Sequence, residues 1–442
     1  MLRATAIAVP QAAWRLNPPV MPSMSSTSPA KNNFQQIWRK NSFNELQESP
    51  FFYQKTLSLH PGHKRPGNHS MKFKSLLPAL LLLLAGCQNN WDRLPVSVQG
   101  YVEEIGAFGE YVPSFSASFL ELSGIEYGDL LQVRIGSNKT FDAPYVYAYS
   151  DAGSMSPNVC NYNREGEQFG IGLTNGNLSE HLVANVGDKI TLTLKEKSAV
   201  KLCNLVHTYV REDYPSDEAF ANFRKAPKLR LLYRSSSPIN YGKNKVRYAY
   251  ADSLCRKAGI KTIIDMADSD EKVQEYLAFT LHEGSYVREI QDNIIGLGVT
   301  ADYIGSAFLE QTARAVREML GRPGPYLIHC NEGKDRTGFF LLLLESLCGA
   351  TLQELEDDYM QTYKNMYALE KGSEAYDAIW EKNGYRMVYH FAHPECWQDL
   401  LRADWSGISL EGTDLSAAAR TYLLETGLTD VEIDSLKNLL SE

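Results

Sequence analysis

The fold of the C-terminal half is decided by the stretch Ile328-His329-Cys330-Asn331-Glu332-Gly333-Lys334-Asp335-Arg336-Thr337-Gly338. An apolar run at 326–328 enters it and another at 339–344 leaves it, which predicts a strand, a loop and a helix. Cys330 and Arg336 stand six positions apart. A loop of this length can curl until its backbone N–H groups and the guanidinium face one point in front of the thiol. That is the layout of an anion-binding loop.

The residue types in this loop suit phosphoryl transfer through a covalent cysteine intermediate. Cys330 precedes a helix N-terminus and two basic residues, surroundings that favour the nucleophilic thiolate. The planar fork of Arg336 can hold two phosphoryl oxygens and follow them into the transition state. We expect Thr337 to donate its hydroxyl to the Cys330 sulfur. We expect His329 to order the loop through backbone hydrogen bonds rather than to take protons.

The remaining loop positions are expected to bind the substrate. Gly333 lets the backbone approach an anion, and Gly338 lets the following helix pack closely. Lys334 adds a second positive charge, which suits a substrate bearing more than one phosphate. The substrate-binding positions are thus Asn331, Glu332, Gly333, Lys334 and Gly338.

Composition and charge limit the partners. Of 442 residues, 44% are apolar and 22% charged, which is ordinary for a globular protein. Residues 1–70 carry eight Lys or Arg against two acidic residues; because the whole chain carries −9, residues 71–442 carry −15. An acidic body repels nucleic acid, so a local basic cluster has to hold any anionic substrate. The seven cysteines show no metal-ligand spacing, and we expect neither metal nor cofactor.

Two segments precede the folded part of the chain. Residues 1–70 are rich in Pro, Ser, Asn and Gln, and we expect them to be disordered and upstream of the true start at Met71. Residues 71–87 have a basic flank, an apolar run and the ending Leu84-Ala85-Gly86-Cys87, which resembles a bacterial lipoprotein signal peptide. The run is too short for a spanning helix, and a buried helix is the alternative. We therefore expect an exported protein, anchored to a bacterial membrane through lipidated Cys87, in the periplasm or at the cell surface.

Residues 95–200 are predicted to form a small all-β domain, in which Gly and Asn clusters separate short runs of alternating apolar and polar residues. Cys160 and Cys203 lie in or beside it. An exported location permits a disulfide between them, and two buried thiols are the alternative. The predicted strands include 96–98, 131–135, 145–149 and 190–194.

Residues 212–442 are predicted to form an α/β domain with a central, mostly parallel sheet flanked by helices, because strands and helices alternate. In such a sheet, ligands bind beyond the carboxyl ends of the strands, where Cys330 stands. The C-terminal helices, at 416–426 and 430–440, are expected to pack on this unit as a lid or buttress. Further helices are predicted at 216–224, 246–258, 270–279 and 307–320, and strands at 229–233, 261–265 and 326–329.

The loop resembles the signature of the cysteine-dependent protein tyrosine phosphatases, and within them that of the bacterial tyrosine/lipid phosphatase subfamily, His-Cys-x-x-Gly-Lys-Asp-Arg-Thr-Gly. The resemblance covers roughly residues 215–440 and includes Arg234-Ser235 upstream. It implies a tyrosine-phosphatase-like fold and hydrolysis of phosphomonoesters through a phosphocysteine intermediate. One segment departs: where the family usually has Asp-Leu-Arg, this chain has Asp265-Met266-Ala267, so an arginine that commonly braces the site is missing.

The general acid, which protonates the leaving oxygen, is open between three carboxyl groups. The subfamily resemblance implies Asp335, inside the loop. Asp265, at the end of a predicted strand, and Asp302, before the helix at 307–320, are the alternatives, as acid or as support of the site.

The residues favour a phosphatase, and they leave its substrates open between phosphotyrosine proteins, phosphoinositides and inositol polyphosphates such as phytate. The alternative is a catalytically weak or inactive phosphate-binding or adhesion lipoprotein, because Ala267 departs from the family pattern.

Overall fold

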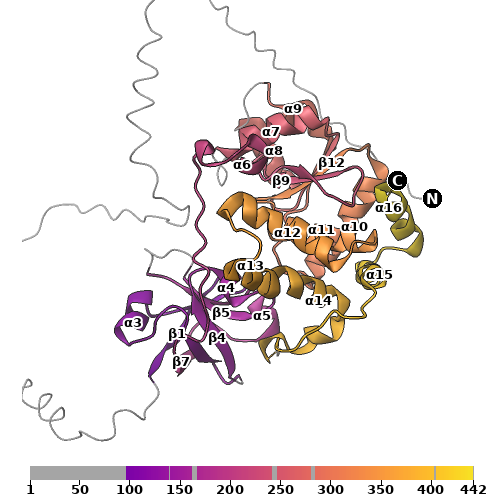
Figure 1. Ribbon diagram of the computed structural model, residues 1–442. Helices are drawn as coiled ribbons and strands as arrows, with labels where there is room; N and C mark the ends of the chain where they lie inside the picture. The colour runs from indigo at the N-terminus through magenta and orange to yellow at the C-terminus, as the bar shows by residue number, and fades with distance from the viewer. Residues whose placement is uncertain are drawn as a thin grey trace, which may run out of the picture. The chain divides into compact units, whose positions relative to one another are not determined.

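The strand that enters the loop, β12 (Tyr326–Cys330), lies at the centre of a five-stranded sheet in the computed structural model (Figure 1). Three of the four strand pairings are parallel, and the edge strand β8 pairs antiparallel with β9. The α/β class is therefore confirmed. In order, the strands are β11 (Ile294–Gly296), β10 (Thr262–Asp265), β12, β9 (Leu232–Ser236) and β8 (Arg224–Lys225).

The structure describes residues 96–138, 140–161, 167–240, 246–279, 284–402 and 405–441. The predictions for residues 1–70 and for the signal peptide at 71–87 with its lipidated Cys87 lie outside these ranges. Within them, no helix is both long and apolar enough to cross a membrane.

Helices cover both faces of the sheet, because neighbouring residues of each buried strand point to opposite sides. Ile263 packs with α7 and α8 in one hydrophobic cluster, and Ile264 packs with α10 and α11 in the other. Three of the helix predictions are confirmed to within one residue at each end. The covering helices are α7 (Arg247–Ala258), α8 (Asp270–Phe279), α10 (Ser306–Gly321) and α11 (Arg336–Leu347).

The helix predicted at 216–224 is wrong beyond its first turn. α6 (Asp217–Phe220) begins at the cap Ser216, whose side chain accepts the N–H of Ala219, but it is only four residues long. Asn222 then adopts a left-handed backbone with φ of 51°, which ends the helix and lets β8 form. This break matters for the site, because it carries Asn222 and Arg224 toward the loop. The strand predicted at 229–233 likewise begins later, as β9.

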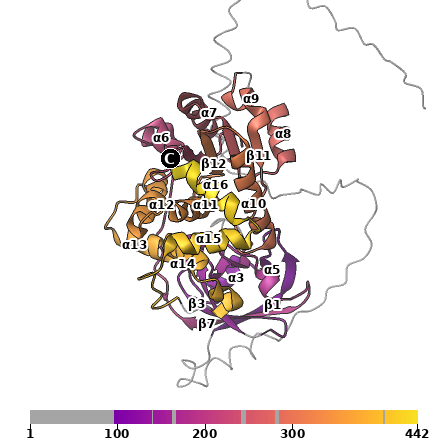
Figure 2. The same cartoon turned by 90° about the vertical axis from the view of Figure 1, so that its right-hand side faces the viewer.

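The C-terminal helices form a buttress. α15 (Leu415–Glu425) contacts α11, and α16 (Asp430–Ser441) contacts α10 (Figure 2). Arg317 on α10 pairs with Glu432 on α16 at 2.7 Å. The remaining helices of this part are α9 (Tyr286–Glu289), α12 (Leu352–Tyr367), α13 (Glu374–Ile379), the π-helix η4 (Trp380–Tyr385), α14 (Arg386–Ala392) and the 3-10 helices η2 (Arg211–Asp213), η3 (Gln291–Asn293) and η5 (Pro394–Arg402).

The domain expected to be all-β is a closed seven-stranded barrel that also contains three short helices, so the prediction was wrong in that detail. The strand predicted at 145–149 ends early, at Val146. The helices are α3 (Ala117–Leu122), α4 (Tyr149–Ala152) and α5 (Leu178–His181). Around the barrel, the strands are β1 (Ser97–Ile105), β2 (Tyr111–Pro113), β6 (Gly170–Leu173), β5 (Pro157–Cys160), β4 (Phe141–Val146), β3 (Leu130–Ile135) and β7 (Lys189–Glu196).

The early end of β4 has a topological cause. β4 and β5 are parallel neighbours, so the chain between them has to cross over instead of forming a tight turn. The crossover contains α4. Cys203, beyond the barrel strands, is a free thiol among the described residues, and burial, followed by the nearby Asp151, raises its pKa to about 11.

Candidate active site

The predicted loop leaves the carboxyl end of the central strand. Cys330 is the last residue of β12 and is only 3% exposed, and Arg336 is the first residue of α11. Between them the chain turns at Gly333, where φ is +69° and an added Cβ would lie 2.2 Å from the Ser235 carbonyl oxygen. Glycine is required there for both reasons.

Donors outside the loop hold three successive loop carbonyls. The Ser237 N–H donates to Asn331 O at 3.1 Å, the Asn222 amide donates to Glu332 O at 3.1 Å, and the Arg234 guanidinium donates to Gly333 O at 2.7 Å. Because these carbonyls are directed outward, the loop's N–H groups are left for the inner side of the turn, the arrangement that binds anions.

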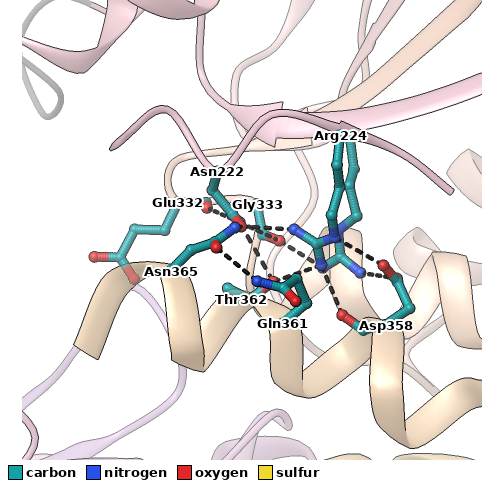
Figure 3. Close-up of polar contacts among 9 residues, drawn as sticks. Asn222, Arg224, Glu332, Gly333, Asp358, Gln361, Thr362 and Asn365 are labelled. Atoms are coloured by element: carbon teal, nitrogen blue, oxygen red, sulfur yellow. Dashed lines mark hydrogen bonds and ion pairs between the residues drawn. The ribbon is translucent and has the colours of Figure 1, made fainter. Parts of the chain in front are cut away.

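Two of the donors, Asn222 and Arg234, are themselves held by helix α12, and Figure 3 shows the network around Asn222 and Asp358. Asp358 on α12 accepts from Arg234 at 2.6 Å and from Arg224 at 2.8 Å, and all three side chains are largely buried. Arg224 also donates to Asn222 Oδ1 at 2.6 Å and to Thr362 Oγ1 at 3.0 Å. Burial disfavours the Asp358 carboxylate, but the two arginines outweigh burial and lower its pKa. The side chains that hold the loop are therefore fixed by ion pairs with Asp358.

Arg336 is anchored beside Cys330. Its guanidinium donates to Val299 O at 2.9 Å, in the loop that follows β11. Burial opposes its charge, but Cys330, followed by Asp265 and Asp335, outweighs burial and raises the Arg336 pKa. The contact with Val299 fixes the guanidinium fork at the helix end of the same loop that begins at Cys330.

Lys334, expected to add a second positive charge to the loop, lies beside two carboxylates of the same loop. It is 7% exposed, and its ammonium lies 3.3 Å from Glu332 Oε2 and 4.0 Å from Asp335 Oδ2. Burial opposes its charge, but Asp335, Glu332 and nearby tyrosines outweigh burial and raise its pKa well above the ordinary value. Three tyrosine rings surround the ammonium at 5.4–5.9 Å from their centroids: Tyr149, Tyr363 and Tyr367.

Asp265 and His329 lie side by side at the ends of neighbouring strands. Asp265 Oδ1 accepts the Ala267 N–H at 2.8 Å and stands 3.7 Å from His329 Nδ1. Burial raises the pKa of Asp265 to about 7 and lowers that of His329 to about 4. His329 Nδ1 also lies 3.3 Å from Cys330 O, which fits an ordering role. Asp265 is fully enclosed, a position suited to supporting the site.

Two other predicted residues remain. Asp302 lies before α10, where its backbone carbonyl accepts the Gly305 N–H at 3.1 Å and its Oδ1 has no hydrogen-bond partner within the described residues; burial, with Glu180 nearby, raises the pKa of its carboxyl to about 6. Thr337 was expected to donate to the Cys330 sulfur. Its hydroxyl is buried and has no hydrogen-bond partner in the part of the chain that the structure describes, so that bond is not formed.

Comparison with known proteins supports a phosphatase class for this fold and loop. The family whose model matches is the tyrosine phosphatase family, over residues 223–442, about half of the chain. No curated protein matches.

Three solved structures are similar to parts of the chain. One is an uncharacterized conserved protein from Thermotoga maritima, 24% identical over 23% of this chain, with a TM-score of 0.20; the chain spans only 38% of that protein. The core catalytic domain of the PP-IP phosphatase SIW14 from S. cerevisiae, in complex with citrate, is 22% identical over 40% of this chain and 93% of its own, with a TM-score of 0.24. A second Siw14 catalytic core is 19% identical over 40% of this chain and 92% of its own, with a TM-score of 0.23.

The sequence reasoning missed the residues that hold the loop from outside. Asn222 and Arg224 were assigned to a helix, and nothing in their spacing connects them to residues more than a hundred positions later. The position of the missing family arginine, Ala267, also looked like a weakness of the site. In the structure, Arg234 on the neighbouring strand β9 donates to the loop carbonyl of Gly333, and Arg224 on β8 supports the loop indirectly through Asp358 and Asn222.

Proposed function

We propose that residues 212–442 hydrolyse phosphomonoesters, with Cys330 as the nucleophile, Arg336 as the phosphate-binding cation and Asp335 as the general acid. The observation that carries the proposal is the anchored Arg336 guanidinium beside the nearly enclosed Cys330 at the mouth of a loop whose carbonyls are directed away. An anion held there meets a sulfur, a guanidinium and backbone N–H groups at once.

In the first step, the Cys330 sulfur attacks phosphorus and forms an S–P bond while the ester P–O bond breaks. Asp335 gives its proton to the leaving oxygen, and Arg336 holds the equatorial oxygens through the transition state. In the second step, water attacks the phosphocysteine, the Asp335 carboxylate accepts a water proton, and the S–P bond breaks to release phosphate. The loop needs no other reactant.

Asp335 is the best placed of the three candidate acids. Its side chain is 21% exposed within the loop, whereas Asp265 is fully enclosed. Asp302 is also buried, at 7% exposure, and lies before α10. A general acid has to contact the leaving group of a substrate that enters from solvent. The partly exposed Asp335 is therefore favoured over the enclosed Asp265.

The substrates are phosphorylated molecules, and the loop gives no reason to prefer several phosphates on one molecule. A preference for several phosphates was expected because Lys334 adds a second positive charge to the loop. Two carboxylates lie within 4.0 Å of its ammonium and offset that charge. The alternative of a silent phosphate-binding protein depended on Ala267. It loses weight because Arg234 supplies a brace to the loop.

The proposal is tested by measuring phosphate released from p-nitrophenyl phosphate, a phosphotyrosine peptide, a phosphoinositide and phytate by the chain from Gln88 onward. Cys330→Ser is expected to lower turnover by about a thousandfold or more, because a serine hydroxyl without an adjacent base is a much weaker nucleophile than the cysteine sulfur. Cys348→Ser, at the far end of α11, is the matched control and should keep wild-type turnover. Equal turnover by the two variants would sink the proposal, as would a wild-type protein that binds phosphate and hydrolyses none of the four.

A further inference from the structure

A residue of the barrel reaches the catalytic loop. Tyr149, the first residue of α4, donates its hydroxyl to Asp335 Oδ2 at 2.8 Å, although the two residues are 186 positions apart. The same ring lies over the Lys334 ammonium, 5.6 Å from ring centroid to nitrogen. Burial, followed by the charge of Asp335, raises the Tyr149 pKa well above its ordinary value. The hydroxyl therefore stays protonated and acts as a donor at neutral pH.

This contact is fixed on the barrel side by the helical part of the phosphatase region. Asn383 on η4 donates to Ser150 O at 3.0 Å, and Lys382 donates to Asp151 O at 3.2 Å. The Ser154 N–H donates back to Lys382 O at 2.8 Å. The residues after Tyr149 are thus tied to η4, so the crossover cannot shift without breaking several hydrogen bonds.

Other groups around Asp335 interact with it through charge. Lys334 lies 4.0 Å from Oδ2, and Arg336 follows in the chain. Burial raises the pKa values of Tyr303, Tyr359 and Tyr363, and the charge of Asp335 adds to the rise. Tyr149 differs from these tyrosines in donating a hydrogen bond directly to one carboxyl oxygen. A hydrogen bond fixes the direction of a carboxyl group, which charge at a distance does not.

We propose that Tyr149 is a positioning residue: with Oδ2 held by the barrel, Asp335 presents Oδ1 to the leaving oxygen. This inference rests on the proposed function, in which Asp335 is the acid. When Oδ1 gives up its proton, the Tyr149 hydroxyl and the Lys334 ammonium stabilise the carboxylate that remains. In the second step the same orientation lets the carboxylate accept the proton of the attacking water.

The test compares substrates whose leaving groups differ in their need for a proton. Nitrophenolate departs without protonation, whereas phenolate from phenyl phosphate needs it. Tyr149→Phe keeps the ring over Lys334 and removes only the hydroxyl. We expect kcat/KM for phenyl phosphate, which reports the first step alone, to fall about tenfold, as part of the contribution of a positioned acid, while kcat/KM for p-nitrophenyl phosphate stays near wild type. Tyr147→Phe is the matched control, since it removes the same group from a tyrosine whose hydroxyl donates to Asn204.

A second measurement separates positioning from general damage. Asp335→Asn removes the acid, so Tyr149→Phe in that background should cause no further loss on phenyl phosphate. Equal losses of Tyr149→Phe on both substrates, no loss on either, or additive losses with Asp335→Asn would each overturn the inference. Failure of the proposed function itself is distinguishable, because the wild-type protein would then turn over neither substrate.

Discussion

The Glu345 side chain, on the buried helix α11, lies in an unfavourable environment for a charged carboxylate. It is 1% exposed, and neither carboxyl oxygen has a hydrogen-bond partner within the described residues. Burial, followed by the charge of Asp358, raises its pKa well above the ordinary value, against the effect of Arg234 and Arg224. The folded protein therefore holds a proton here that the unfolded chain loses.

Wild-type stability should consequently fall as the pH rises from the ordinary carboxyl pKa through the raised pKa of folded Glu345. Glu345→Gln cannot titrate, so we expect it to raise the free energy of unfolding at mildly alkaline pH by about 1 kcal/mol or more, since one pKa unit is worth about 1.4 kcal/mol. At acidic pH it should match wild type. Urea unfolding at several pH values measures both.

Glu354→Gln is the control of opposite sign. The Glu354 side chain pairs with Lys228 and caps α12 at Thr351, interactions that lower its pKa to about 2. Its replacement should lower stability at neutral pH, an effect that fades as the pH falls toward that value. A Glu345→Gln protein less stable than wild type at alkaline pH would contradict the assignment.

At the level of single residues, the sequence predicted the part of the site that lies within one short stretch of the chain. Cys330 and Arg336 follow from their spacing around a strand, loop and helix. The state of Lys334 does not, because its neutralising partners are partly local carboxylates and partly tyrosines from α4 and α12. Which residues carry the chemistry stays a prediction until the substitutions are measured.

Among the structural elements, the loop between Cys330 and Arg336 requires glycine at one position. Gly333 and Gly349, which follows α11, both have left-handed backbones, with φ of +69° and +83°. An added Cβ at Gly349 meets nothing within 4 Å, whereas at Gly333 it meets backbone atoms of Ser235. Alanine at either position would adopt an unfavourable left-handed backbone. Only at position 333 would its Cβ also collide with backbone atoms of Ser235.

Gly349→Ala should cost about 1 kcal/mol of stability, the usual penalty for a left-handed residue, and leave turnover unchanged. Gly333→Ala has to move the loop away from β9, so turnover is expected to fall at least about a hundredfold. Chemical unfolding and p-nitrophenyl phosphate turnover of the two variants give the comparison. Similar turnover in both would mean that the loop can relax without losing its geometry.

Hydrophobic periodicity was sufficient to predict helices that are long and amphipathic, such as α8 and α10. It failed at α6, where a single left-handed residue, Asn222, ended the helix, and at β4, where a crossover replaced the last part of a strand. Both errors are cases in which tertiary pairing outweighed local preference.

Across residues 96–441, as far as they are described, the barrel and the α/β part share one hydrophobic core. The same buried cluster contains Tyr145 and Met155 of the barrel and Ile328 and Phe339 of the α/β part. Because neither side buries its apolar surface alone, we expect a single cooperative unfolding transition with equal calorimetric and van't Hoff enthalpies. Scanning calorimetry of the chain from Gln88 onward measures this, and two resolved transitions would contradict it.

For the whole molecule, the sequence indicated a β-rich part followed by an α/β part but not that they meet at the loop. Contacts such as Asn175 with the Tyr303 hydroxyl, at 3.2 Å, join side chains 128 positions apart. No periodicity or motif reports such a contact, because each partner is an ordinary turn or core residue in its own neighbourhood.

The parallel pairing of β4 and β5 has a consequence for how this chain can diverge. The crossover that the pairing requires delivers Tyr149 to the loop, so a barrel substitution that moves α4 also changes the catalytic loop. The two parts cannot be exchanged with counterparts from other proteins one at a time. In a functional chimera, the crossover, η4 and the loop all have to come from the same parent protein.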